Sequence, residues 1–156
     1  MLPKKTAENI IVACLLTGIH DVNRNAVLPN DDYSLVKKWA DSIIKLNLHG
    51  VIFHNHFSAD TCKKYDNENI QFVKVNYNAS YNPNVYRYFI YSQFLAEQKE
   101  KIKNIFCTDV SDVVLLKNPF TQPLFINNPG SIFAVMNPNN LMMNGCWNML
   151  HIYEAT

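Results

Sequence analysis

The sequence predicts an α/β domain in which helices cover both faces of a mostly parallel sheet. Short apolar runs such as Asn9–Leu16 and Ile70–Val75 alternate along the chain with longer amphipathic stretches. Buried parallel strands are continuous apolar runs, whereas amphipathic helices repeat apolar residues every three to four positions. A chain of 156 residues can bury a core and favours one domain. We therefore expect residues 1–156 to form a single three-layer sandwich.

The first half of the chain contains five expected elements. Asn9–Leu16 is apolar almost throughout, which is typical of a buried strand. Tyr33–Asn47 repeats apolar residues at helical spacing and predicts an amphipathic helix. Val51–Phe53 is expected to be a second, short strand. Thr61–Tyr65 then predicts a short helix, and Ile70–Val75 predicts a third strand.

The second half begins with a predicted helix over Asn84–Lys103, because Pro83 suits a first turn. Its apolar and aromatic residues recur as one helical stripe: Val85, Tyr88, Phe89, Tyr91 and Leu95. Ile105–Cys107 and Val113–Leu116 are both apolar runs and predict two buried strands. Ser131–Asn137 predicts one more. Strands that alternate with helices indicate a mostly parallel sheet.

Two carboxylates stand at the seam between the two strands expected on either side of them. Asp109 follows Ile105–Cys107 after one threonine, and Asp112 directly precedes Val113–Leu116. Carboxylates held this close repel each other, and a divalent cation relieves that repulsion. Hard oxygen ligands suit Mg²⁺ or Mn²⁺. Open α/β sheets bind ligands at the carboxyl ends of their strands, where Asp109 is expected.

The segment Asp109-Val110-Ser111-Asp112 resembles the metal-binding Asp-x-Asp signature of GT-A glycosyltransferases, with one additional residue between the aspartates. Asn118-Pro119-Phe120 is similar to the segment that follows this signature in several of these families. Tyr86-Arg87 resembles the motif on the preceding helix of the glycogenin and lipopolysaccharide-galactosyltransferase kind. The resemblance implies that Arg87 contacts the signature aspartate and the donor sugar, and that Asp109 and Asp112 hold Mn²⁺ or Mg²⁺.

The same resemblance implies a Rossmann-type GT-A fold that binds a UDP- or GDP-sugar. The expected reaction transfers a hexosyl or deoxyhexosyl group to a carbohydrate or glycoprotein acceptor. Donor binding is then expected from the loop after the first strand and from the end of the second: Thr17, Gly18, Asp21 and Arg24, with His54 or Asn55. In many GT-A enzymes a histidine near the C-terminus is a third metal ligand, a place that His151 would take.

The numbers of glycines and arginines limit the kinds of phosphate-binding site that this chain can form. The chain has only four glycines, so neither a Gly-x-Gly-x-x-Gly fingerprint nor a P-loop can be written. Among fourteen lysines and arginines, only Arg24 and Arg87 are arginines. The planar guanidinium grips phosphate or carboxylate bidentately, as lysine does not. Side chains and a metal, rather than a glycine-rich loop, are expected to hold any phosphate.

Charge, hydropathy and cysteine usage limit the partners and the compartment. The net charge is +1 without a basic block, which argues against nucleic acid, and no segment is long enough to span a membrane. The four cysteines are scattered, as expected of reduced thiols in the cytoplasm. Two other functions stay open. The aspartates also suit a metal-dependent phosphohydrolase or nuclease, and a chain shorter than a usual GT-A domain also suits a non-catalytic nucleotide-sugar-binding fragment.

Overall fold

The first compact unit is built on a four-stranded parallel sheet. The computed structural model describes residues 7–21, 25–78, 80–98 and 100–128, and the chain divides into two compact units between Asn118 and Pro119. The strand order is β5-β4-β1-β6, and every neighbouring pair is parallel. The strands are β1 (Asn9–Leu15), β4 (Gly50–His54), β5 (Ile70–Lys74) and β6 (Asn104–Thr108). This confirms the predicted α/β class.

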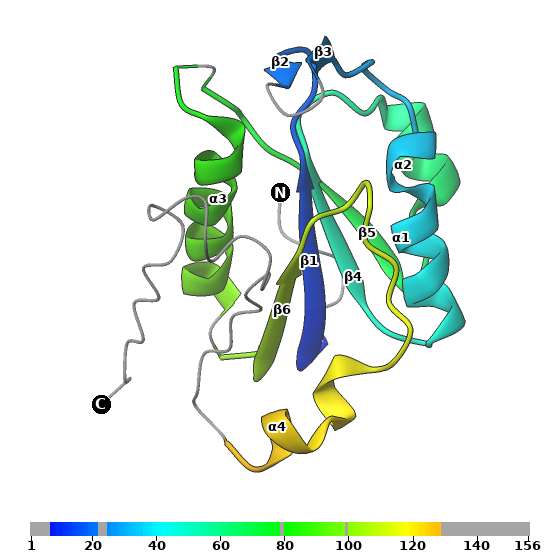
Figure 1. The fold of residues 1–156 in the computed structure, drawn as a ribbon, viewed down its shortest axis with the longest axis vertical. Helices are drawn as coiled ribbons and strands as arrows, with labels where there is room; N and C mark the ends of the chain where they lie inside the picture. Colours follow the sequence, from blue (N-terminus) through cyan, green and yellow to red (C-terminus); the bar gives the residue numbers. More distant parts are fainter. Residues whose placement is uncertain (1–6, 22–24, 79, 99, 129–156) are drawn as a thin grey trace. The chain divides into compact units, whose positions relative to one another are not determined.

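Helices cover both faces of the sheet, as expected of a Rossmann-like three-layer fold. Helices α1 (Ser34–Lys45) and α2 (Ala59–Tyr65) lie on one side, and α3 (Pro83–Gln98) lies on the other (Figure 1). Consecutive side chains of a strand point to opposite faces, so a strand covered on both sides must be apolar at every position. Strand β1 meets this requirement, with Ile10 to Ala13 all at most 2% exposed.

The face covered by α3 carries an aromatic core. Phe53 of β4 packs edge-on against Phe94, with ring centroids 5.2 Å apart, and lies 5.8 Å from the ring of Tyr91. The buried members of this cluster come from β1 and the residue that follows it, and from β4, β5 and α3: Ile10, Val12, Leu16, Val51, Phe53, Val73, Ile90, Tyr91 and Phe94. Helix α3 is therefore held by its Ile90, Tyr91 and Phe94 face.

The opposite face is covered by α1, with Trp39 fully buried at its centre. Gly50, the first residue of β4, allows this close approach. A Cβ atom added there would lie 2.8 Å from Trp39 Cη2 and 3.1 Å from Ile70 Cδ1. Removing a buried tryptophan side chain typically costs about 3–5 kcal/mol. Gly50 thus makes room for the largest side chain of this layer.

The polar loop after β1 contains a short hairpin that the sequence did not predict. Strands β2 (His20–Asp21) and β3 (Ala26–Val27) pair antiparallel. Asn25 has a φ of 48° and Asp31 has a φ of 57°. These are the non-glycine residue types that best tolerate the left-handed region. The hairpin keeps this loop compact beside the carboxyl end of β1 (Figure 1).

The strand predicted over Val113–Leu116 is wrong, because this segment is irregular. Leu115 is buried, but Leu116 is 84% exposed and Val114 is 49% exposed. The Leu115 N–H donates to Ser42 Oγ of α1 at 3.1 Å, in place of a ladder partner. An apolar run therefore passes along a helix here, and Asp109 and Asp112 are not flanked by two strands.

The long helix is shorter than predicted and buries a different face. It ends at Gln98, whose carbonyl accepts from the Lys101 and Ile102 N–H groups in a closing turn. In the predicted stripe, Tyr91 is buried. Val85, Tyr88 and Phe89 are each at least half exposed. Apolar residues therefore stand on two sides of α3, and only one side belongs to the core.

The second unit contains the 3₁₀ helix η1 (Pro119–Thr121) and the short helix α4 (Pro123–Ile126). The rings of Phe120 and Phe125 pack edge-on with centroids 6.0 Å apart. The strand predicted over Ser131–Asn137 and the histidine at 151 lie outside the described residues. Within the described ranges, no helix is both long and apolar enough to cross a bilayer.

Candidate functional site

The topology defines a switch point between β1 and β6. The chain passes from β1 to β4 and β5 on one side, and then crosses back over α3 to place β6 on the other side of β1. Open α/β sheets bind their ligands outside the carboxyl ends of the strands at such a point. Thr17 and Gly18 follow β1 there, and Asp109 follows β6. Two predicted site segments thus reach the same edge of the sheet.

Arg87 of α3 forms an ion pair with Asp109, between Nη1 and Oδ1. The Arg87 side chain is 20% exposed and that of Asp109 is 58% exposed. The Arg87 Nε–H donates to the Asn84 carbonyl at 3.1 Å, which fixes the side chain along its own helix. Burial opposes the charge of Arg87, but the hydrogen bond and the charge of Asp109 outweigh it and raise the pKa of this guanidinium. Arg87 is therefore a permanent cation held at the switch point.

Helix α1 anchors both ends of the loop that carries the aspartates. The Trp39 indole N–H donates to Thr108 Oγ1 at 2.8 Å, where β6 ends. Ser42 accepts from the Leu115 N–H farther along. Between these two hydrogen bonds, Val110 is 4% exposed, and its burial holds the middle of the loop in place. The loop is thus fixed at three points. The sequence did not indicate this role for Trp39 and Ser42, because an amphipathic pattern does not show which strand end a helix will reach.

Asp109 and Asp112 are both exposed, and the chain bends at Val110–Asp112 between them. Across the described residues, no three His, Cys, Asp or Glu side chains form a group that could hold a metal ion. Mg²⁺ commonly keeps several waters and takes one or two carboxylates together with substrate phosphates. Asp109 and Asp112 could supply the one or two protein carboxylates of such a site. A cation at this loop would depend on oxygens from its ligand as well.

Asn55 joins the ends of β1 and β4. Its Oδ1 accepts from the Thr17 N–H at 3.0 Å, and its Nδ2 donates to the Thr17 carbonyl at 3.0 Å. Both polar atoms of the amide are therefore engaged with one residue of the first loop. The contact to a nucleoside that the resemblance implies for Asn55 stays a prediction, and the structure adds a positioning role.

His56 and Gly18 complete this corner. His56 Nδ1 lies 3.0 Å from the Thr17 carbonyl oxygen. Because a carbonyl oxygen can only accept, this nitrogen carries the proton and donates it. Thr17 Oγ1 lies 3.2 Å from the same nitrogen. Gly18 has a φ of +76°, and a Cβ there would lie 2.8 Å from His56 Cε1. Gly18 is therefore required by backbone conformation and by close approach. The sequence did not indicate His56, because three consecutive polar residues end this strand.

His54 belongs to the interior. Its side chain is 2% exposed, and its Nδ1 accepts from the Phe57 N–H at 3.1 Å. Its Nε2 lies 3.5 Å from Cys62 Sγ. Burial, with further contributions from nearby charges, lowers the pKa of His54 from 6.5 to about 4. His54 is thus a neutral, structural histidine, which leaves Asn55 as the candidate at this strand end.

A buried phenol lies on α3 one helical turn after Arg87. Tyr91 is 4% exposed, and its Oη has no hydrogen-bond partner among the residues that the structure describes. Burial raises the pKa of Tyr91, with smaller effects from the neighbouring Cys14, Cys107 and Arg87. An unpaired buried hydroxyl costs free energy. The helical stripe in the sequence indicated that Tyr91 would be buried, but not that its hydroxyl would lack a partner among the described residues.

Two predicted residues cannot be brought into this site. Asp21 pairs with Ala26 in the hairpin, but the position of its side chain is not described. Arg24 lies outside the described residues.

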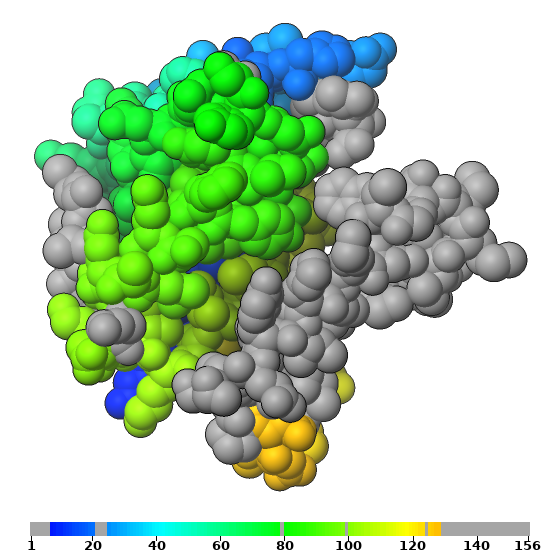
Figure 2. Space-filling model, turned by 90° about the vertical axis from the view of Figure 1, so that its left-hand side faces the viewer, coloured from blue at the N-terminus to red at the C-terminus, as the bar shows by residue number. Residues whose placement is uncertain are grey.

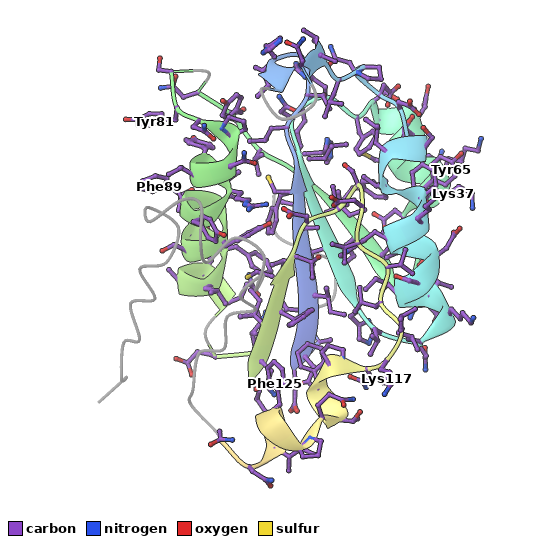
Figure 3. The ribbon with its side chains drawn as sticks, in the orientation of Figure 1. Lys37, Tyr65, Tyr81, Phe89, Lys117 and Phe125 are labelled. Carbon is purple, nitrogen blue, oxygen red and sulfur yellow. The ribbon has the colours of Figure 1, made fainter. Side chains whose placement is uncertain are left out.

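A hollow of about 430 Å³ lies elsewhere, at the N-terminal end of α1 and along α2. One side is formed by Tyr33 and Tyr65, whose rings stack 3.5 Å apart, near Lys37 (Figure 3). None of the predicted site residues lines this hollow. Its lining carries both signs of charge, and it is separate from the switch point.

No family model matches the chain, and neither a curated protein nor a solved structure matches it at a significant level. The geometry of the site and the sequence itself are therefore the basis for assigning a function.

Proposed function

We propose that this chain is a metal-dependent glycosyltransferase domain that binds a UDP- or GDP-sugar at the carboxyl edge of the sheet. It would transfer a hexosyl or deoxyhexosyl group to a carbohydrate or glycoprotein acceptor. The observation that carries this proposal is the Arg87–Asp109 contact at the switch point. A guanidinium and a carboxylate meet where sheets of this kind bind nucleotides.

Because the chain has no glycine-rich phosphate loop, the side chains of Arg87, Asp109 and Asp112, with a metal ion, would have to bind the phosphates of the donor. A nucleoside diphosphate carries charges that must be neutralised, and with four glycines the chain has no P-loop to cradle them. Asp109 and Asp112 would hold Mn²⁺ or Mg²⁺, which when bound acts as a Lewis acid on the diphosphate leaving group. Arg87 supplies a second, fixed positive charge.

Arg87 has donors available for this task. One of its N–H groups is used by the Asn84 carbonyl, and another binds Asp109. A guanidinium has five N–H donors, so further ones remain for a phosphate or a sugar hydroxyl. A cation at Asp109 would compete with Arg87 for the carboxylate and release more of them. The ion pair thus holds the Arg87 guanidinium in a fixed position with N–H groups left to bind the donor.

The first loop would hold the nucleoside. Asn55 and His56 fix the Thr17 backbone, and Gly18 turns the chain away from β1. We assign the nucleoside to Thr17, Gly18 and Asn55, with Asp21 and Arg24 from the same loop. A cytoplasmic setting suits the three described cysteines, which are free thiols.

Thermal unfolding with UDP, GDP and their sugars, each with and without Mn²⁺, tests this function. Mn²⁺ and a nucleoside diphosphate should stabilise the protein together more than either does alone. A ligand at a hundred times its dissociation constant adds about 2.7 kcal/mol. Equal melting temperatures with and without both ligands would contradict the proposal. Release of free phosphate or nucleotide without an acceptor would indicate a phosphohydrolase or nuclease instead.

Two variants separate the roles of the aspartates. Asp112→Asn should abolish the Mn²⁺ dependence of donor binding, and Asp109→Asn should weaken it, because the last aspartate of the signature is expected to be the direct ligand. Asp60→Asn, at an exposed carboxylate of α2, is the matched control. If both loop variants keep the Mn²⁺ affinity of the unmodified protein, these aspartates form only a solvated turn.

A further inference from the structure

The outer side of α3 and the loop before it expose a group of large apolar side chains, which we call the α3 aromatic face. It consists of Tyr81, Val85, Tyr88 and Phe89, which are 53%, 50%, 55% and 56% exposed. Figure 2 looks at the molecule from this side, and Figure 3 shows Tyr81 and Phe89 pointing away from the sheet. Exposed apolar patches of this kind often mark binding surfaces.

The grouping is specific to this surface. Within the described part of the chain, Tyr81, Tyr88 and Phe89 are the only phenylalanine, tyrosine or tryptophan side chains that are exposed. Val85, Tyr88 and Phe89 follow helical spacing and share one side of α3. The core side of the same helix is supplied by Ile90, Tyr91 and Phe94. The exposed rings are therefore not needed to hold the helix on the sheet.

Ring contacts and hydrogen bonds hold this face in place. The Phe89 centroid lies 6.4 Å from that of Tyr81 and 6.2 Å from that of Tyr86. The Tyr77 hydroxyl donates to the Tyr81 carbonyl, and the Tyr86 hydroxyl donates to the Asn76 carbonyl at 3.2 Å. The loop is thus tied to the helix that follows it. A platform fixed in this way loses little conformational entropy when it binds a ligand.

The segment that carries the face is polar but almost uncharged. Between residues 75 and 96 the only charged residue is Arg87, and Asp109 pairs with it. Asn78 and Asn82 are exposed, and their amide oxygens accept from the Ser80 and Asn84 N–H groups. Their NH₂ groups are then the donors at the rim. Nucleic acids and anionic membranes require clusters of lysine and arginine, which this surface lacks.

The size of the face argues against a stable protein interface. An aromatic side chain offers about 150–250 Å², so four half-exposed side chains offer roughly 400 Å². A stable protein complex buries about 800 Å² on each partner. Flat rings with amide donors around them suit a smaller, neutral ligand that has apolar faces and many hydroxyl groups.

We propose that the α3 aromatic face is a binding platform for a neutral oligosaccharide. The C–H faces of two or three pyranose rings would stack on Tyr81, Tyr88 and Phe89, and the asparagine amides would bind the hydroxyl groups. This site goes beyond the proposed donor site, because it requires neither a nucleotide nor a metal ion. It would hold a glycan on the helix that also carries Arg87.

Isothermal titration of the full chain with neutral hexasaccharides tests the platform, without nucleotide or Mn²⁺. The probes are the β-1,4-glucan, α-1,4-glucan and β-1,4-N-acetylglucosamine hexamers. We expect at least one to bind, and Tyr81→Ala/Phe89→Ala to weaken it about tenfold or more, since two stacking contacts are lost. Tyr88→Ala should weaken it less. Val27→Ala/Leu116→Ala, which truncates two exposed apolar residues elsewhere, should leave the affinity unchanged.

Three outcomes would overturn the proposal. The first is that no hexasaccharide binds at millimolar concentration. The second is that the two double variants weaken binding equally. The third is sedimentation that shows a dimer of the unmodified chain and a monomer of Tyr81→Ala/Phe89→Ala, which would assign the face to a second copy. Mn²⁺-dependent nucleotide binding by the same variants reports on the donor site separately, so failure of one proposal is distinguishable from failure of the other.

Discussion

Protonation of His54 should destabilise the fold in mild acid. The imidazole is buried, with its ring 5.2 Å from that of Phe57 and 6.0 Å from that of Phe72. Burial, together with the smaller effects of Lys74 and His56, lowers the pKa of His54 to about 4, and Asp31 acts in the opposite direction. In the unfolded chain the pKa returns to 6.5. The native protein therefore binds the proton less readily than the unfolded chain does.

The size and sign of the effect follow from these two pKa values. Above pH 6.5 the histidine is neutral in both states, and its contribution to stability is complete. Between pH 6.5 and about 4 the unfolded chain takes up a proton that the native state refuses, so stability falls as the pH falls. A pKa difference of one, which is a tenfold change in proton affinity, is worth about 1.4 kcal/mol, so the full loss between 6.5 and about 4 is about 3 kcal/mol.

Urea unfolding between pH 4 and pH 7 measures this loss when the protein is compared with His54→Gln. Glutamine keeps an acceptor for the Phe57 N–H but cannot be protonated, so the variant should lose less stability on acidification. His56→Gln, at an exposed neighbouring histidine, should retain most of the pH dependence, because His56 makes only a small contribution to the pKa of His54. NMR titration of the His54 ring should give a midpoint near 4. A His54 midpoint near 6.5 in the folded protein, or the same dependence of stability on pH in His54→Gln, would contradict this prediction.

Three further substitutions test the site. Trp39→Phe removes the hydrogen bond to Thr108 Oγ1 and should cost about 1–2 kcal/mol in urea unfolding, while adding Thr108→Val should cost less than the sum of the two single changes. Gly18→Ala forces a side chain to a φ of +76° against His56 and should cost about 1–3 kcal/mol. His56→Ala should recover only part of that loss, because the backbone strain remains; full recovery would refute the strain. Arg87→Lys should weaken donor binding in calorimetry with little change in melting temperature, and unchanged binding would place Arg87 outside the donor site.

The order of the elements was predictable because apolar runs and helical repeats alternate clearly. The Val113–Leu116 segment was not, because it has the composition of a strand but lies against α1 through Leu115. Composition indicates how apolar a segment is, but its burial depends on which other parts of the chain pack against it. Leu116 is apolar and yet 84% exposed, because it does not pack against another element of the described chain as Leu115 does.

The site was predictable only in part for the same reason. The Arg87–Asp109 contact follows from the expected order of helix and strand together with the resemblance. The ties from Trp39 and Ser42 to the aspartate loop depend on how α1 crosses the sheet. Such contacts between distant segments leave no local pattern in a sequence.

The Asn55 amide has a consequence for the edge of the sheet. One residue that exchanges both an N–H and a C=O bond with its neighbour is the arrangement of a hydrogen-bonded antiparallel pair. Asn55 reproduces it with a side chain, so its carboxamide serves as a surrogate peptide group for Thr17. The β4 backbone can then turn away while β1 remains held for two residues beyond its last ladder position. An aspartate at position 55 could accept but not donate, and would leave the Thr17 carbonyl without this partner.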